Sequence, residues 1–290
     1  MSDQFPDMSG AYELLAPAKT NLWLRVHGQR EDGYHEIETR MVTLRLHDRI
    51  RFQWRDDDHV VLRCSDRSLP RGEDNLAVKA VRALERHTNK VFSISIDLEK
   101  NIPSGAGLGG GSSDAAAVLR AINVMGSLFL PEDELAAIGA QIGSDVPFFI
   151  YDRPCDCRGR GEVVTPLKEG EGPGALPVLL IKPNFEISAG WAYRRYASSS
   201  EYDGFLYAPQ SCPWGEMVND LERPVFEKFT VLGEMKSWLL AQAEVSAALM
   251  SGSGSTMMAI LKPGLDGTGL LARALERYGE NCWTFLGQTS

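Results

Sequence analysis

The stretch Pro103–Ala117 is the part of the sequence whose residue types most directly suggest chemistry. Five glycines fall within seven of its residues, two serines follow them, and an alanine-rich segment comes next. Glycine has no Cβ, so its backbone amide can approach a ligand closely. The first N–H groups of the helix expected behind the glycines are unpaired and lie at the positive end of its dipole. The stretch therefore predicts a phosphate site for a nucleotide. A flexible linker is the alternative, and the helix directly after the glycines disfavours it.

Two glycine patterns compete for the type of phosphate loop. Gly105, Gly107 and Gly110 satisfy the dinucleotide pattern GxGxxG, and acidic residues follow about 20 positions later. However, Glu132–Glu134 follows a proline and opens a helix instead of ending a strand, and a charged bend at Glu99–Asn101 precedes the glycines. A Walker A loop is excluded because no Gly-Lys-Ser/Thr follows, and the His-Arg-Asp and Asp-Phe-Gly motifs of protein kinases are absent from the sequence.

Four further side chains could act on a ligand held at such a loop. Asp145, in Gly-Ser-Asp-Val-Pro, could accept a proton as a general base, although aspartate is common in turns and the residues alone favour that interpretation. Lys19 lies in an apolar stretch and could keep Asp145 ionised, whereas a lone lysine is usually at the surface. Tyr34 could stack on a pyrimidine while His35 pairs with its edge, although such a pair after a glycine turn is more often structural.

Composition limits the class of protein. The chain has 290 residues, enough for two domains, and a formal net charge of −9, which argues against a nucleic-acid binder. The N-terminus lacks a signal-peptide pattern, and no run of 18 apolar residues occurs, so we expect a cytoplasmic protein without a membrane partner. The five cysteines are odd in number and scattered, as in a reducing compartment. Cys155 and Cys157 lack further nearby ligands, so no metal site is expected there.

Strands and helices are expected to place these residues. Tyr12–Val26 is predicted to be the strand that carries Lys19, and Val91–Leu98 the strand that leads into the glycines. Ser112–Met125 is predicted to be the helix behind them, with Ser112 or Ser113 as its N-cap. Phe148–Tyr151 is expected to be a short strand.

The remaining pattern mixes strands and helices without a regular βαβ rhythm, which favours the α+β class. The other expected helices are Asn75–His87, Pro131–Ile142, Ile187–Tyr196, Asn219–Phe229, Leu232–Ala241 and Leu265–Tyr278. The other expected strands are Ile37–Leu46, Asp48–Gln53, Val60–Cys64, Leu176–Ile181, Thr256–Leu261 and Cys282–Leu286. Residues 1–11 are expected to be a loose extension and Ser198–Pro213 a surface loop, and the domain boundary is placed between residues 160 and 161.

The glycine-rich stretch at residues 103–117 resembles the signature of the GHMP kinases, Pro-x-x-x-Gly-Leu-Gly-Ser/Gly-Ser-Ser followed by alanines. Pro103–Ala117 reproduces this order with one extra glycine, Gly111, and Met250–Ser255 is similar to the third motif of the superfamily. The resemblance implies an α+β, two-domain GHMP kinase fold. An N-terminal domain similar to ribosomal protein S5 (1–160) would bind ATP, and a ferredoxin-like domain (161–290) would form the substrate cleft with it.

One branch of the superfamily is matched in particular. Ala16–Leu22 followed by Gly28–Glu36 is similar to the branch that serves the non-mevalonate route to isoprenoid precursors. Further matches are Glu73–Leu76, Ile142–Phe149 and Gly159–Glu162, whereas Thr20 and Pro154–Arg158 depart from the branch. The resemblance implies ATP-dependent phosphorylation of the C2 hydroxyl of a CDP-linked methylerythritol. Another GHMP kinase, of the homoserine or mevalonate type, and a non-catalytic nucleotide-binding regulator are the alternatives.

The resemblance also assigns roles to residues of this chain. It implies that Lys19 and Asp145 are catalytic and that Asn21, Tyr34, His35 and Tyr193 bind the substrate. The positions implied for ATP are Asn75, Lys100, Pro103, Ser104, Gly105, Ala106, Gly107, Leu108, Gly109, Gly110, Gly111, Ser112 and Ser113. For Asn75 a helix cap and for Lys100 a solvated turn are the alternatives. ATP is expected with Mg²⁺ but without a dedicated set of metal ligands, and the protein is expected to be a monomer or homodimer that binds small molecules and no nucleic acid.

Overall fold

The computed structural model of the chain describes residues 11–279 and 282–290. The described residues form two compact units that interleave along the sequence. Unit 1 comprises the residues up to Ala18, Leu46–Ile102 and Gly109–Asp152, and unit 2 comprises Lys19–Arg45, Pro103–Leu108 and Arg153–Ser290. The boundary between residues 160 and 161 stays a prediction, and residues 1–10 of the expected N-terminal extension lie outside the described residues.

Two long strands pass through both units. They are β1 (Tyr12–Gln29) and β2 (His35–Trp54), and they pair with each other. The expectation of two strands at Ile37–Leu46 and Asp48–Gln53 is wrong, because β2 runs through without a break. Asp48, the polar residue with which the second strand was expected to begin, is fully buried, and its carboxylate accepts the backbone N–H groups of Asn101 and Ile102, so it need not turn to solvent.

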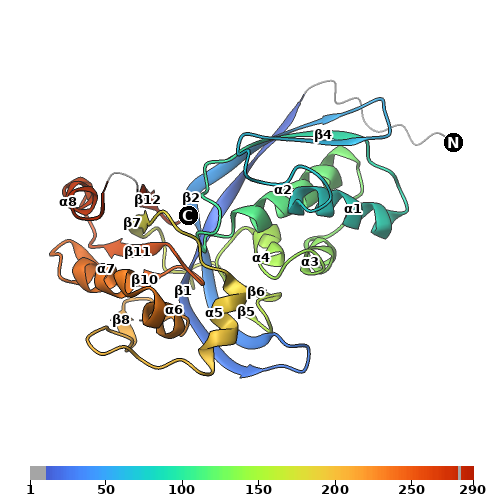
Figure 1. Ribbon diagram of the computed structural model, residues 1–290. Coiled ribbons are helices and arrows are strands. Elements are labelled where there is room, and N and C mark those ends of the chain that lie inside the picture. Colours follow the sequence, from blue (N-terminus) through green and yellow to red (C-terminus); the bar gives the residue numbers. More distant parts are fainter. Residues whose placement is uncertain (1–10, 280–281) are drawn as a thin grey trace. The chain divides into compact units, whose positions relative to one another are not determined.

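In unit 1, the sheet carries helices on one face (Figure 1). The second half of β2 pairs antiparallel with β4 (Ile94–Glu99), and β3 (Val60–Cys64) pairs parallel with β4. The helices are α1 (Leu76–Thr88), α2 (Gly110–Met125), α3 (Glu132–Ala140) and α4 (Val146–Tyr151). The helix α4 corrects the strand expected at Phe148–Tyr151. A short, fully apolar run fits a buried strand or a buried helix turn equally well, and here Pro147 lies in the first turn of a helix.

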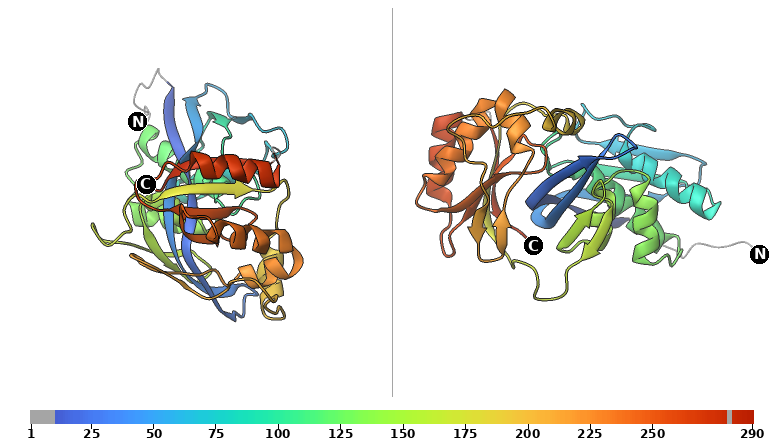
Figure 2. Two further views of the ribbon diagram at one scale, coloured as in Figure 1. Left: turned by 90° about the vertical axis from the view of Figure 1, so that its left-hand side faces the viewer. Right: turned by 90° about the horizontal axis from the view of Figure 1, so that it is seen from below.

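Unit 2 contains a four-stranded antiparallel sheet with the order β10-β11-β7-β12. Its strands are β7 (Pro177–Lys182), β10 (Val245–Met250), β11 (Met257–Leu261) and β12 (Trp283–Gln288). Helices α5 (Ala189–Tyr196), α6 (Glu222–Lys228) and α7 (Thr230–Leu240) lie between the first two strands of this sheet in sequence, and α8 (Thr268–Tyr278) lies between the last two. This βαββαβ sequence of elements and strand order agree with the ferredoxin-like expectation. Figure 2 shows α7 in orange and α8 in red beside the sheet.

The remaining strands of unit 2 are short. The first half of β2 pairs with β5 (Cys155–Arg158), which pairs in turn with β6 (Val163–Pro166). A hairpin of β8 (Gln210–Cys212) and β9 (Gly215–Met217) begins inside the segment that was expected to be a surface loop. Helix α6 begins at Glu222, three residues later than expected, because Asn219 is engaged with its side chain elsewhere. The α+β class is confirmed.

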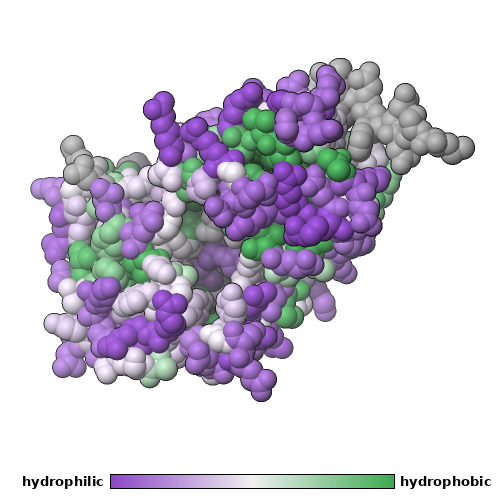
Figure 3. Space-filling model, turned by 45° about the vertical axis from the view of Figure 1, so that its right-hand side comes forward, coloured by the Kyte–Doolittle hydropathy of each residue, from purple (hydrophilic) through white to green (hydrophobic). Residues whose placement is uncertain are grey.

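The surface is mixed. On the face drawn in Figure 3, hydrophilic side chains in purple surround smaller hydrophobic areas in green. Large apolar side chains that are exposed on the described residues include Phe129, Val91 and Val124. In the described part of the chain, no helix is long and apolar enough to cross a membrane.

Candidate active site

The glycine loop and the start of α2 lie next to each other along the chain but belong to different units. Pro103–Leu108 belongs to unit 2, whereas α2 begins at Gly110 in unit 1. The N-cap is Gly109 with a φ of 72°, and no described side chain caps the helix, so the expectation that Ser112 or Ser113 is the N-cap is wrong. This left-handed backbone conformation favours glycine, which has no Cβ. The first hydrogen bond within the helix runs from the Ser113 N–H to the Gly109 carbonyl. The backbone N–H groups that precede Ser113 in the first turn therefore have no partner within the helix.

The start of α2 carries two buried oxygen atoms without a hydrogen-bond partner among the described residues. They are Ser113 Oγ and Asp114 Oδ1. Buried polar atoms are nearly always satisfied, so an unsatisfied hydroxyl beside the N–H groups of a helix start is suited to binding a ligand. The Ser113 hydroxyl can donate to a phosphate oxygen, as the N-terminal amides can.

A buried charge cluster fixes the segment that leads into the loop. The Lys100 ammonium donates to carboxylates of Asp48 and of Asp114, the latter at 2.8 Å. Its side chain is 7% exposed, so the solvated turn considered for Lys100 is wrong, although a contact with ATP stays a prediction. Burial lowers the pKa of Lys100, but the two carboxylates outweigh this and raise it. Burial, with a contribution from Asp48, raises the pKa of Asp114 to about 7 against the opposing effect of Lys100.

Asn75 serves as the N-cap of α1. Its Oδ1 accepts the Ala77 N–H at 2.9 Å, and its Nδ2 donates to the Pro70 carbonyl at 2.7 Å. The helix-cap alternative is thus present in the structure, and the role of Asn75 in binding ATP stays a prediction.

Lys19 lies on β1 at the head of a hydrogen-bonded chain in unit 2. Its backbone N–H donates to the Leu108 carbonyl at 2.9 Å, which joins β1 to the end of the glycine loop. Its ammonium donates to Asn21 Oδ1 at 2.9 Å, and Asn21 Nδ2 donates to Thr39 Oγ1 at 2.7 Å. Lys19 and Asn21 point to the same face of the strand because they are two residues apart. The structure therefore brings together Lys19, Asn21 and the loop.

Asp145 lies in unit 1 immediately before α4, in a turn that approaches the start of α2. A Cβ built on Gly143 lies 3.7 Å from Ser112 Oγ, so the Gly-Ser-Asp turn is adjacent to that serine. Asp145 and Lys19 belong to different units, and their pairing stays a prediction.

Aromatic side chains gather at the beginning of β2 in unit 2. The rings of His35 and Tyr193 stack with centroids 5.8 Å apart and an interplanar angle of 26°. Tyr34 is 52% exposed, and the Arg160 guanidinium lies 5.0 Å from its ring centroid. The Arg160 loop is tied to the same region, since the Gly159 N–H donates to Glu36 at 2.9 Å. The structure therefore places Tyr193 beside His35, and their role in binding the substrate stays a prediction.

Three residues that contact the predicted site residues were not themselves predicted: Asp48 and Asp114, which bind Lys100, and Arg160, which lies beside Tyr34. Asp114 directly follows the two serines of the signature stretch, and Arg160 lies in a stretch already matched to the branch, so both positions carried a signal. Asp48 gave none, because an aspartate within an alternating strand is usually exposed.

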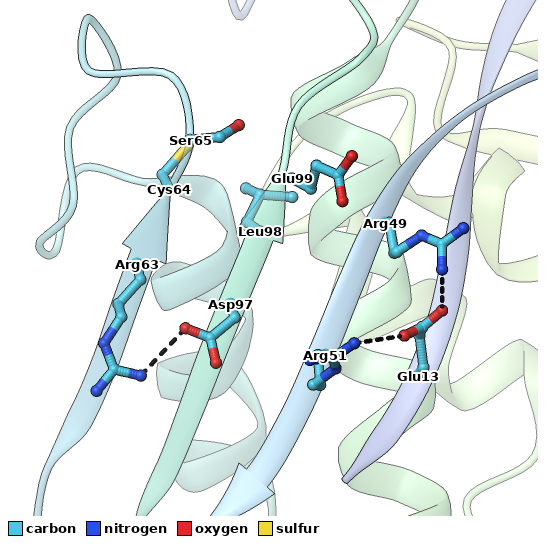
Figure 4. Close-up of a pocket in the computed structure, with 9 residues that line it drawn as sticks. All are labelled: Glu13, Arg49, Arg51, Arg63, Cys64, Ser65, Asp97, Leu98 and Glu99. Atoms are coloured by element: carbon cyan, nitrogen blue, oxygen red, sulfur yellow. Dashed lines mark hydrogen bonds and ion pairs between the residues drawn. The ribbon is translucent and has the colours of Figure 1, made fainter.

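A separate cavity of about 330 Å³ lies in unit 1 on strands β1 to β4. Figure 4 shows Arg63 directed toward Asp97, and Arg49 and Arg51 both directed toward Glu13. Arg49 and Arg51 share Glu13, and Glu99 is the third acidic residue of the lining, so three arginines face three carboxylates and the cavity has no excess positive charge suited to phosphate.

Comparisons with known proteins agree with this geometry. Residues 75–153 match the model of the GHMP kinases N terminal domain. The chain is 38% identical to a 4-diphosphocytidyl-2-C-methyl-D-erythritol kinase of Methylacidiphilum infernorum, over 93% of each protein. It is 40% identical to the kinase of the same name from Syntrophotalea carbinolica, over 86% of this chain and 89% of that one.

Solved structures give the same result. A crystal structure of 4-(cytidine 5'-diphospho)-2C-methyl-D-erythritol kinase matches with a TM-score of 0.75 and 31% identity, over 96% of this chain and 99% of that one. The mevalonate kinase of Methanococcus jannaschii matches with a TM-score of 0.69 and 12% identity, over 98% and 99% of the two chains, which shows the fold alone. The expected GHMP kinase fold is confirmed.

The Asp114→Asn variant tests the charge cluster. A carboxyl with a folded pKa of about 7, against an ordinary value of 3.8, holds a proton that the unfolded chain releases between these values. The free energy of unfolding of the wild type should therefore fall as pH rises from about 4 to about 7 and then level off. Because an asparagine side chain does not titrate, the stability of the variant relative to the wild type should rise by more than about 1 kcal/mol across this window.

Urea unfolding followed by circular dichroism at closely spaced pH values measures this difference. Asp97→Asn, which removes an exposed carboxylate from the same unit, is the control. Parallel curves for wild type and Asp114→Asn would contradict the raised pKa.

Proposed function

The chain belongs to the 4-diphosphocytidyl-2-C-methyl-D-erythritol kinase family of the GHMP kinases, and on this premise we propose how its residues phosphorylate that substrate. The protein is a small-molecule kinase that transfers the γ-phosphoryl group of ATP to the C2 hydroxyl, giving the 2-phosphate and ADP. The observation that carries this function is the 38% identity over 93% of the chain. The stacked rings beside Tyr34, in the unit that also holds Lys19, agree with a cytidine-linked substrate.

ATP binds through backbone groups in this proposal. Phosphoryl transfer requires mainly positioning and stabilisation of charge. The amides of the glycine loop and of the first turn of α2 bind the phosphates, and the Ser113 hydroxyl donates to one phosphate oxygen. The buried state of Ser113 Oγ without a partner among the described residues supports this role.

Asp145 is the general base, and Lys19 stabilises the transferred charge. Asp145 accepts the proton of the C2 hydroxyl as oxygen attacks the γ-phosphorus. The turn that contains Asp145 is adjacent to Ser112, which lies in the first turn of α2, where the phosphates bind in this proposal. This adjacency supports the role of Asp145. Lys19 is tied through its backbone to the loop and through its ammonium to Asn21, so its position is fixed before ATP binds.

His35, Tyr193 and Tyr34 hold the cytidine end of the substrate. The exposed ring of Tyr34 stacks on the base, and His35, oriented by its stack on Tyr193, pairs with the base edge. Asn21, which lies on β1 like Lys19, accepts a hydrogen bond from the Lys19 ammonium and so holds it in place.

ATP enters as its Mg²⁺ complex. Mg²⁺ keeps several waters and takes phosphate oxygens with few protein ligands. Within residues 11–279 and 282–290, no group of three or more His, Cys, Asp or Glu side chains could hold a metal ion. A metal that arrives with the nucleotide requires no dedicated set of protein ligands.

Substrate-dependent release of ADP tests the function. ADP should form with the CDP-linked methylerythritol and not with homoserine or mevalonate, because only the first carries a base for the aromatic group. Preferred turnover of homoserine or mevalonate would assign the chain to another kinase activity. Absence of release with all three would support a non-catalytic nucleotide binder.

Asp145→Asn and Lys19→Ala test the catalytic assignment. Loss of the base should lower kcat by roughly 10²- to 10⁴-fold, since this is the usual contribution of general base catalysis. Steady-state ADP release measures kcat, with Asp133→Asn as the control, an exposed carboxylate of the same unit that binds Tyr151. Near-normal turnover by either folded variant would refute the assignment.

His35→Ala tests the cytidine pocket. Loss of the pairing group should raise the KM for substrate by roughly 10-fold and leave the KM for ATP unchanged, because an unmade hydrogen bond to the base affects only that ligand. The exposed His27, which lies near Glu38 on the neighbouring strand, provides the control variant His27→Ala. Equal increases in both KM values would contradict the pocket.

A further inference from the structure

The side chain of Asn219 spans the start of the second glycine turn, residues 251–255. Asn219 is 2% exposed, and its Nδ2 donates to the carbonyls of Met250 and Gly252, both at 2.7 Å. Its Oδ1 accepts the Leu221 N–H at 3.0 Å. Both amide hydrogens and the amide oxygen are therefore used, and the carbonyls on either side of Ser251 are held by one side chain.

The turn held in this way packs directly on the glycine loop. Ser251 Oγ donates to the Gly107 carbonyl at 3.0 Å, and the Thr256 N–H donates to the Ala106 carbonyl at 3.3 Å. A Cβ built on Gly107 would lie 2.1 Å from the Ser251 carbonyl oxygen, so the two backbones touch. A shift of the turn would therefore move the loop.

The same turn lies against the ammonium of Lys19. A Cβ built on Gly252 would lie 3.2 Å from Lys19 Nζ and 3.6 Å from Asn21 Oδ1. Gly252, whose carbonyl is held by Asn219, therefore lies next to the Lys19 side chain.

The backbone around Asn219 is joined to the strand that carries Lys19. The Leu24 N–H donates to the Val218 carbonyl at 2.8 Å, and the Asp220 N–H donates to the Leu24 carbonyl at 3.0 Å. The position of Asn219 is therefore fixed by β1, and Asn219 holds the turn at residues 251–255 against the glycine loop. All of these residues belong to unit 2.

From these contacts we infer that Asn219 is a positioning residue for phosphoryl transfer, which acts through the turn at Ser251 on the Gly107 backbone and on Lys19. The inference rests on the proposed function for the identity of the ligand at the loop. Because Asn219 is buried and its amide is used within the protein, we assign it no contact with ATP or the acceptor; it sets the geometry in which the loop and the ammonium meet the phosphates. Small displacements of such groups reduce the rate strongly.

Asn219→Ala and Asn219→Asp test this role. Alanine leaves two buried carbonyls without their amide donor, and aspartate directs a carboxylate oxygen at them. We expect kcat/KM for ATP to fall about 10- to 100-fold for alanine and further for aspartate. The dissociation constant of CDP, a probe for the cytidine side alone, should not change. Asp220→Ala is the matched control, because it removes hydrogen bonds from the Val26 N–H and the Tyr196 hydroxyl but none to the turn, and it should preserve both constants.

A double-mutant cycle identifies the route of the effect. If Asn219 acts through Ser251, the losses in Asn219→Ala and Ser251→Ala should not add in kcat/KM for ATP. Additive losses, or weakening of CDP and ATP binding in proportion to a lowered Tm, would overturn the inference and leave Asn219 a structural residue. Calorimetric binding of a non-hydrolysable ATP analogue to the same variants gives a result even if the wild type phosphorylates no acceptor, so the two failures are distinguishable.

Discussion

The contact between the Gly107 and Ser251 backbones is the constraint on which the rest of the site depends. A Cβ on Gly107 would lie 2.1 Å from the Ser251 carbonyl oxygen, and Gly107 has a φ of 74°, so no other residue fits without displacement. Glycine at this position lets the second turn pack on the loop, and in the proposed function the loop glycines also let backbone amides approach a phosphate. Lys19 is placed by the same assembly, through Leu108 and Gly252.

The residues that have roles in the proposed function are divided between the two units. Unit 1 supplies the start of α2, the unsatisfied Ser113 hydroxyl and the turn of Asp145. Unit 2 supplies the glycine loop, Lys19 and the aromatic group at His35. Because Leu108 is followed directly by Gly109, the stretch Pro103–Ala117 contributes backbone to both units.

Local chemistry in the sequence predicted the loop and the helix after it, because glycine clusters and alanine-rich runs each favour one conformation. Non-local satisfaction of polar groups could not be predicted. Asp48 continues β2 because the partners of its carboxylate come from Lys100 to Ile102, and Asn219 stays outside α6 because its amide holds another turn. The strand expected at Phe148–Tyr151 failed for a different reason, since four apolar residues carry no period that separates strand from helix.

The most direct test of the account is the fate of the γ-phosphorus of ATP. Phosphorus NMR of the protein with ATP, Mg²⁺ and 4-diphosphocytidyl-2-C-methyl-D-erythritol should show a new phosphomonoester on the C2 oxygen that grows as ADP appears, while the diphosphate of the substrate stays intact. Release of inorganic phosphate without a new ester, or an ester on another hydroxyl, would contradict the account.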